Sequence, residues 1–116
     1  MIFSKKAFMV TGKKIVSIHE NEEVGHVYLY LLKNDLNDWP LAVLEDLFVK
    51  EEFRRDGMGS DLVKFAIMEA KRYNCYKIIA TSRNEREDVH KFYEKLGFEK
   101  YGFEFRMNLQ NAKTEN

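Results

Sequence analysis

The hydrophobic period of the chain changes twice, and this change limits the folds open to it more than any other feature. Residues 41–49, LAVLEDLFV, form an apolar run of strand length. Residues 60–74 then follow a helical period with one apolar arc, and residues 76–81 return to a short β-like run. A strand, a helix and a strand in this order form a right-handed crossover between parallel strands. The sequence therefore predicts a mixed α/β fold with a parallel pair at its centre.

The segments before this crossover have the pattern of antiparallel strands. Residues 14–20 alternate and end in a polar stretch, which predicts a strand and a hairpin turn into a longer strand over residues 24–33. Residues 3–10 have the composition of a first strand, joined to the next through Thr11 and Gly12. The side chains of the longer strand that we expect in the core are Val27, Leu29 and Leu31.

A second helix and a last strand are predicted after the crossover. Residues 85–96 carry apolar side chains at helical spacing, with Asn84 as the N-cap and Gly97 as the residue after the C-terminal cap. Residues 103–109 alternate again, as in a strand that closes the chain. The predicted topology is therefore antiparallel at the start and mixed overall.

Length and composition exclude several classes of protein. The 116 residues suffice for one domain, expected over residues 1–110, with a disordered tail at 111–116. Nineteen basic and nineteen acidic side chains cancel without a basic stripe, so nucleic acid is not an expected partner. No window approaches the roughly 18–20 apolar residues of a membrane span, and the N-terminus lacks a secretory signal. One cysteine and three scattered histidines provide neither a disulfide framework nor a metal site. We expect a cytoplasmic, metal-free domain.

A glycine-containing loop lies between the central strand and the first helix. Residues 54–60 read RRDGMGS, and the two glycines let the backbone turn tightly and approach a ligand. The helix that follows presents free N–H groups and the positive end of its dipole, which favour an anion. A Gly-x-Gly turn before a helix is more often a plain structural turn. This one also lacks the third glycine of a dinucleotide motif and the lysine of a P-loop.

Two motifs around this loop resemble the GNAT acetyltransferase superfamily. Residues 49–59, VKEEFRRDGMG, are similar to the family's strand-ending Val, short linker and Arg/Gln-x-x-Gly-x-Gly/Ala. Residues 90–98, HKFYEKLGF, are similar to its Phe-Tyr-x-x-x-Gly-Phe segment, with one helix and one strand between the two motifs. Residues 75–79 and the pair Glu45-Asp46 resemble small-amine members such as glucosamine-6-phosphate N-acetyltransferases. The resemblance implies a mixed, mostly antiparallel sheet with a central parallel crossover and two main helices.

The same resemblance implies acetyl-CoA as the donor. Backbone N–H groups of the glycine loop would hold the pyrophosphate, and the end of the central strand would pair with the pantetheine arm. An N–H near Phe48 would polarise the thioester carbonyl. The family's common Gly-Lys is replaced by Arg55-Asp56, so Asp56 is expected to point to solvent. Arg86 replaces a common asparagine, so Asn84 is carried over instead. The implied donor-binding residues are Leu47, Phe48, Val49, Arg54, Arg55, Asp56, Gly57, Met58, Gly59, Ser60, Asn84 and Arg86.

Acylation of an amine requires a base and an acid. An amine with a pKa of about 10.4 must lose a proton, which a carboxylate can accept directly or through a water. Glu45 and Asp46 lie in an apolar strand, and alternation lets only one face a cleft; we favour Glu45. One of them could instead face solvent or pair with an arginine. Tyr93 has the spacing of a core residue, whereas the resemblance implies a general acid for the leaving thiolate. Cys75 is a poor acetyl carrier because it lies far from the strand end.

The acceptor side is the least determined part of the sequence. The family's first helical pair is missing or much reduced, so the acceptor site is expected to be open, or completed by residues 34–40 or by the second subunit of a homodimer. The acceptor would be a small-molecule or protein amine, lined by Tyr28, Tyr30, Trp39 and Asp46. The two tyrosines fit a core role equally well. Two alternatives stay open: a non-catalytic acetyl-CoA-binding module that regulates a partner protein, and an interaction domain without a cofactor.

Overall fold

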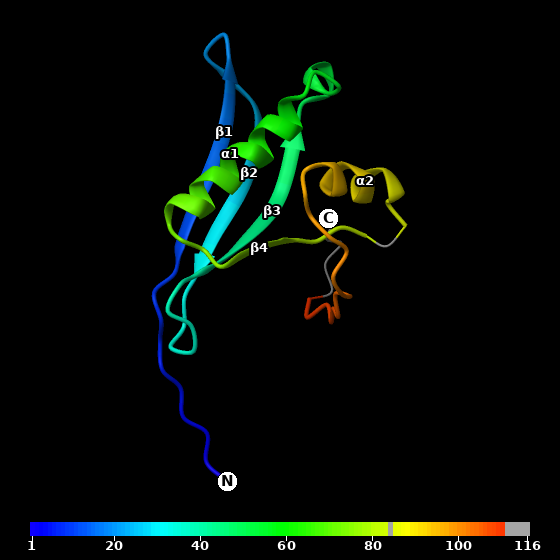
Figure 1. Cartoon of the computed structure of the whole chain (residues 1–116). Coiled ribbons are helices and arrows are strands. Elements are labelled where there is room, and N and C mark those ends of the chain that lie inside the picture. The colour runs from blue at the N-terminus through cyan, green and yellow to red at the C-terminus, as the bar shows by residue number, and fades with distance from the viewer. Residues whose placement is uncertain (84, 111–116) are drawn as a thin grey trace.

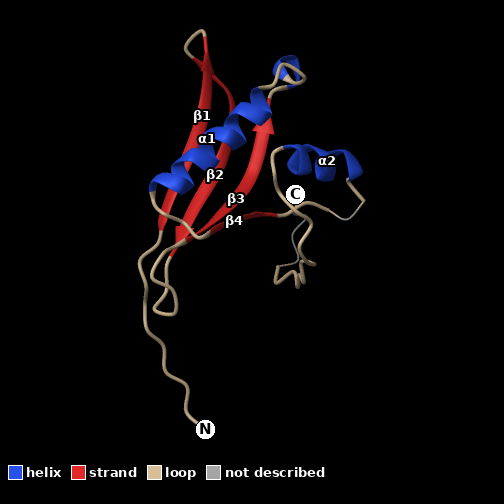
Figure 2. Ribbon diagram, in the orientation of Figure 1, coloured by secondary structure: helices blue, strands red, loops and turns tan. Residues whose placement is uncertain are grey.

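The computed structural model describes residues 1–83 and 85–110, and in this part of the chain one sheet is packed against helix α1 (Figures 1 and 2). The sheet has four strands in the order β1-β2-β3-β4. The first three strands pair antiparallel, and β3 pairs parallel with β4. The predicted mixed α/β fold with a parallel crossover is confirmed. The elements are β1 (Thr11–His19), β2 (Glu22–Leu32), β3 (Leu41–Val49), the 3₁₀ turn η1 (Glu51–Phe53), α1 (Met58–Arg72), β4 (Lys77–Ala80) and α2 (Glu87–Lys95).

The core lies between α1 and one face of the sheet, across which the helix runs (Figure 1). The apolar arc of α1 contributes four buried side chains, and β2 and β3 present theirs to it because alternate strand residues share a face. The predicted core face of β2 is confirmed, since Val27 and Leu29 are fully buried and Leu31 nearly so. The buried side chains are Val27, Leu29, Leu31, Ala42, Leu44, Val49, Leu62, Val63, Ala66 and Ala70.

Strand β3 contains a β-bulge, where two of its residues oppose one residue of β2. Asp46 and Leu47 both lie opposite Val27, and Asp46 has a φ of +54°. A bulge leaves its extra residue unpaired and bends the strand. It also shifts the alternation of β3, so that Leu44 before it and Val49 after it both face the core. The regular pairs on its two sides are Tyr28–Glu45 and His26–Phe48.

Two predicted strands are not strands in the described structure. Residues 3–10 and residues 103–109 belong to no strand. Thr11 and Gly12, predicted as a turn, instead begin β1, where Gly12 lies opposite Tyr30. An alternating pattern is not sufficient for a strand, because the ladder also needs a neighbour to supply its hydrogen bonds.

The helix ends differ from the predicted ones by about two residues. Helix α1 begins two residues early, because Gly57 adopts a left-handed φ of +84° just before it. Helix α2 begins after Arg86; the predicted N-cap Asn84 and the tail 111–116 lie outside the described residues. Gly97 follows α2 with a φ of +100°, which confirms the predicted C-terminal glycine.

Candidate active site

Strands β3 and β4 separate halfway along β3. They pair only over residues 41–44 and 77–80, so residues 45–49 of β3 have no partner on that side among the described residues. Figure 1 shows α2 beyond this end of β3, away from α1. An unpaired strand edge presents a row of backbone N–H and C=O groups, to which an extended ligand can add by main-chain hydrogen bonds. The free edge of β3 over residues 45–49 is therefore the candidate site.

The charge of Glu45, the predicted base, acts on Tyr93, the predicted acid. Tyr93 on α2 is partly buried, and its ring lies 5.2 Å from those of Phe92 and Phe98, measured between centroids. Burial raises the pKa of the Tyr93 phenol, and the nearby Glu45 carboxylate raises it further. The phenol is therefore protonated at neutral pH, which is the state that an acid must start from.

Glu45 and Asp46, the two carboxylates of β3, differ in their backbone conformation and in their neighbours. Glu45 is exposed, lies opposite Tyr28 and is the carboxylate whose charge acts on Tyr93. Asp46 is exposed at the bulge, in a left-handed conformation that non-glycine residues rarely adopt. Strain of this kind persists where the surroundings hold it, and it gathers at functional sites. Of the two, only Glu45 affects the pKa of Tyr93; the choice of Glu45 as the base stays a prediction.

The glycine loop leads into the N-terminus of α1, whose first backbone N–H groups are free to donate hydrogen bonds. Asp61 donates its backbone N–H to the carbonyl of Gly57 at 2.9 Å, so the three N–H groups before it have no acceptor within the helix. No described side chain caps this end of α1. Arg55 adds a second left-handed residue to the loop, with a φ of +74°. The loop residues thus fit an anion such as a phosphate.

Arg54 ties this loop to the end of β3. Its Nε donates to the carbonyl of Val49 at 2.6 Å, and its guanidinium lies 5.5 Å from the centre of the Phe48 ring. The resemblance placed Arg54 among the donor-binding residues. It gave no sign of this contact with β3, because the partner is a backbone carbonyl. Asp56, two residues on, is exposed as expected.

Other predicted site residues lie elsewhere. Trp39 is exposed on the loop between β2 and β3, six residues or roughly 20 Å of extended chain from Glu45. Tyr30 is two pairs further along β2 than Tyr28, opposite Val43. Arg86 pairs with Asp88 at 3.4 Å. The structure therefore places Tyr28, and not Trp39, beside Glu45.

Cys75 lies away from the candidate site, at the opposite end of β3, whereas His26 lies beside it, opposite Phe48. The Cys75 thiol is partly buried just after α1, and its burial raises its pKa, which lowers its reactivity as a nucleophile. Sequence reasoning did not single out His26, whose ring lies 5.4 Å from that of Tyr28 and 5.6 Å from that of Phe48. Its place opposite Phe48 was hidden by the bulge.

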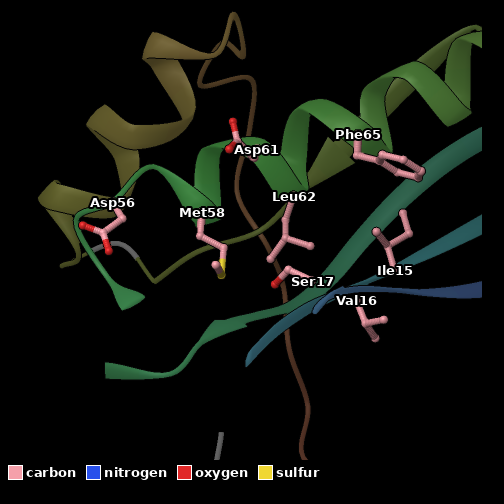
Figure 3. A pocket seen from close by; sticks show the side chains of 8 residues that line it. All are labelled: Ile15, Val16, Ser17, Asp56, Met58, Asp61, Leu62 and Phe65. Atoms are coloured by element: carbon pink, nitrogen blue, oxygen red, sulfur yellow. The ribbon is translucent and has the colours of Figure 1, made fainter. Parts of the chain in front are cut away.

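A cavity of about 300 Å³ lies at the other edge of the sheet, between β1 and α1 (Figure 3). Neither Tyr93 nor Glu45 lines it. Its lining residues are Ile15, Val16, Ser17, Asp56, Met58, Asp61, Leu62 and Phe65. Within residues 1–83 and 85–110, no cluster of three or more His, Cys, Asp or Glu side chains could hold a metal ion. No helix there is long and apolar enough to span a bilayer.

Residues 11–100 match the family model for the acetyltransferase (GNAT) domain, and the chain belongs to this acetyltransferase family. It is 30% identical over 69 residues to the aminoglycoside N(6')-acetyltransferase type 1 of Acinetobacter baumannii, a match that covers 60% of this chain and 47% of that protein. The resemblance seen in the sequence is thereby confirmed.

Solved structures share the fold. A protein described as a transcriptional regulator from Bacillus halodurans is 29% identical, with a TM-score of 0.79 over 84% of this chain and 66% of its own. The glucosamine-6-phosphate N-acetyltransferase of Arabidopsis thaliana has a TM-score of 0.69 at 23% identity, over 78% of this chain and 60% of its own. The chain thus spans about half of the curated relative and about two thirds of these structures. The second likeness shows the fold alone.

Proposed function

We propose that this chain transfers the acetyl group of acetyl-CoA directly to a primary amine within a ternary complex. The observation that carries the proposal is the free edge of β3 over residues 45–49, where the Glu45 carboxylate raises the pKa of the partly buried Tyr93 phenol. Family membership supports acyl transfer, and the name of the aminoglycoside N(6')-acetyltransferase relative supports an amine acceptor.

The donor fits two features of the described backbone. The uncapped N-terminus of α1, with the loop residues Arg55 to Ser60, would hold the pyrophosphate, because free N–H groups and the helix dipole favour an anion. The free edge over residues 45–49 would pair with the amide groups of the pantetheine arm. When bound, acetyl-CoA supplies an acetyl group activated as a thioester.

In the proposed transfer, Glu45 would accept one proton and Tyr93 would donate another. Glu45 takes the proton of the amine, directly or through a water, so that the nitrogen lone pair is free to form the new C–N bond. Tyr93 donates its phenolic proton to the sulfur as the C–S bond breaks. A backbone N–H near Phe48, beside the bulge, would stabilise the negative charge on the carbonyl oxygen.

The acceptor that we propose is a small molecule that carries a primary amine. The open side of Glu45 is bordered by the phenol of Tyr28 and by the Asp46 carboxylate, which attract a protonated amine. The aminoglycoside acetyltransferase relative supports this choice over a protein amine. A panel of small amines, peptide N-termini and lysine peptides, followed by release of the CoA thiol, distinguishes the two.

Acetyl-CoA at 100 times its dissociation constant is expected to stabilise the fold by about 2.7 kcal/mol, which for this size is a melting shift on the order of ten degrees. Gly57→Val and Gly59→Val are expected to remove the shift. Valine resists the left-handed φ at Gly57, and at Gly59 a side chain would grow toward Phe92 and Val49, the first contact lying at 3.8 Å. Thermal melting with and without the ligand measures the effect.

Gly102→Ala serves as the control for these two variants, because nothing lies within 4 Å of the position that its Cβ would take. It should keep the full shift. An unchanged shift in both valine variants would show that the loop is not the phosphate site.

A regulatory module that binds acetyl-CoA without turnover is the second candidate. It is favoured by one observation, the similar structure described as a transcriptional regulator. A melting shift with acetyl-CoA, together with no thiol release across the whole amine panel, would establish this candidate and rule out the enzyme.

Glu45→Gln is expected to lower turnover most at neutral pH and to recover part of it at higher pH. The variant cannot accept the amine's proton, and the fraction of free amine rises about tenfold per pH unit below the amine's pKa of about 10.4. The pH profile of the acetyl-transfer rate measures this recovery. Asp46→Asn is the comparison: it should weaken binding of the protonated amine but leave the pH dependence of turnover at saturating amine as in the wild type. A recovery at high pH in Asp46→Asn and not in Glu45→Gln would make Asp46 the base.

A further inference from the structure

The cavity between β1 and α1 has a lining of its own, which includes neither Tyr93 nor Glu45 (Figure 3). Its volume of about 300 Å³ is at the lower end of the range for small-molecule sites. A water molecule has a share of about 30 Å³ in the liquid, so the cavity has room for on the order of ten non-hydrogen atoms. A ligand of this size is a molecule with one ring or one short branched chain.

Most of the cavity wall is apolar, and part of this apolar wall is open. Leu62 on α1 is buried, whereas Phe65, about one turn further along the helix, is 56% exposed although it is large and apolar. Figure 3 shows both side chains on the side of α1 that faces Ile15 of β1. An apolar surface left open between two elements is typical of a ligand-binding groove. An aromatic or branched apolar group would be buried favourably there.

The charged residues of the lining are both acidic. They are Asp56 and Asp61, and the side chains of both are exposed at the mouth of the cavity. Within residues 1–83 and 85–110, neither carboxylate forms an ion pair. Two carboxylates without a cation, beside an apolar cavity, favour a ligand that carries a positive charge.

Ser17 adds a buried hydroxyl on the β1 side of the cavity. In the described part of the chain its Oγ has no hydrogen-bond partner, although most buried polar atoms in proteins have one. Ser17 also lies where the pairing of β1 with β2 shifts, since Ser17 pairs with Gly25 and Ile18 with Glu23. Irregularities of this kind are frequent at sheet edges and beside binding sites. A ligand N–H group in the cavity would supply the missing partner.

We propose that this cavity binds a small organic cation, in which a primary ammonium group is attached to an aromatic or branched apolar group. An ammonium group has three N–H donors, and the polar side chains of the lining, Asp56, Asp61 and Ser17, all accept hydrogen bonds. The apolar group would pack between Ile15 and Phe65. Binding at this second site does not depend on the proposed acetyl transfer.

Nuclear magnetic resonance with 2-phenylethylamine, in the absence of acetyl-CoA, is the first test. We expect saturable shifts of the amide signals of Ser17, Met58 and Phe65. 2-Phenylethanol has the same size and no charge, and it should bind about threefold more weakly or worse, because exposed carboxylates contribute only modestly. Asp56→Asn/Asp61→Asn should remove this difference between amine and alcohol. Equal affinities in the wild type, or a difference that survives in the double variant, overturn the proposal.

Phe65→Ala tests where the amine lies, and it should weaken binding about tenfold because it removes the aromatic wall. Met68→Ala is the matched control, since Met68 is also exposed on α1, at 65%, and does not line the cavity. Circular dichroism checks that both variants fold like the wild type. Binding that persists in Phe65→Ala and is lost in Glu45→Gln would place the amine at the free edge of β3 and overturn the second site.

The cavity shares Asp56 and Met58 with the glycine loop. A cation beside Asp56 offsets the repulsion between this carboxylate and the phosphates of a bound donor, so the amine should tighten the binding of coenzyme A about threefold. Coenzyme A must then tighten the binding of the amine by the same factor. This coupling rests on the proposed donor site, whereas the amine site is measured without coenzyme A.

Calorimetric titration of coenzyme A, with and without saturating 2-phenylethylamine, measures the coupling. Equal affinities overturn the coupling alone. No binding of coenzyme A under either condition would contradict the proposed function together with the coupling, while the shifts caused by the amine alone still decide whether the second site exists.

Discussion

Tyr93→Phe is expected to lower the rate of acetyl transfer by roughly 10- to 1,000-fold while the affinity for acetyl-CoA stays the same. The change removes one hydroxyl and keeps the ring that packs between Phe92 and Phe98. A loss of turnover at equal binding is typical of a group that acts in the transition state. Steady-state turnover and the melting shift with acetyl-CoA measure the two quantities separately.

Tyr73→Phe is the matched control for this change. Its hydroxyl accepts a hydrogen bond from Lys13 at 2.7 Å, at the C-terminal end of α1, and its loss should leave turnover unchanged. If Tyr93→Phe keeps full activity, Tyr93 is the core residue that its helical spacing suggests, and the proton on the leaving sulfur comes from elsewhere.

Gly25→Val is expected to destabilise the fold by about 3 kcal/mol, the upper end of the usual range for overpacking. A Cβ at Gly25 would lie 2.8 Å from Ser17 Oγ, 3.1 Å from the backbone oxygen of Phe48 and 3.2 Å from Leu62. The backbone oxygen cannot turn aside as a side chain can, so β2, β3 and α1 would have to separate. The midpoint of urea unfolding reports the change.

Gly12→Val in β1 provides the comparison. Its Cβ would meet only the ring of Tyr30, at 3.3 Å, and that exposed ring can rotate away. Valine also favours strands, so the cost at this position should stay well below that at Gly25. Equal midpoints for Gly25→Val and the wild type would mean that the close approach of α1 to the sheet is not a constraint on the fold.

The parts of the fold that follow from local pattern were predictable. Strand β3 was predicted with its observed bounds because its apolar run stops at Pro40 and Lys50. The apolar arc of α1 is buried as its spacing indicates. Residues 3–10 and 103–109 were wrongly predicted as strands, because their patterns say nothing about whether a partner edge is within reach.

The candidate site, like the fold, could be predicted only where local sequence pattern determines the structure. The loop with Gly57 and Gly59 was visible in the sequence, since a turn into a helix needs such residues there. The contact of Arg54 with the carbonyl of Val49 was not, because no residue type signals a backbone acceptor. Nor was the bulge, since the rule of alternation assumes one residue on β3 for each residue on β2. The roles of Tyr93 and Glu45 stay predictions until the variants are measured.

The bulge in β3 also identifies Asp46 as a residue that is not needed for the pairing of β2 with β3. If Asp46 were deleted, Leu47 alone would face Val27, and the ladder would be regular from one end to the other. Leu44, Leu47 and Val49 would then keep the core face by simple alternation. Over this stretch, β3 is therefore one residue longer than its pairing with β2 requires, and Asp46 is the extra residue. The extra residue of β3 therefore has no part in holding the sheet together, and what it changes is the course of the free edge that follows it.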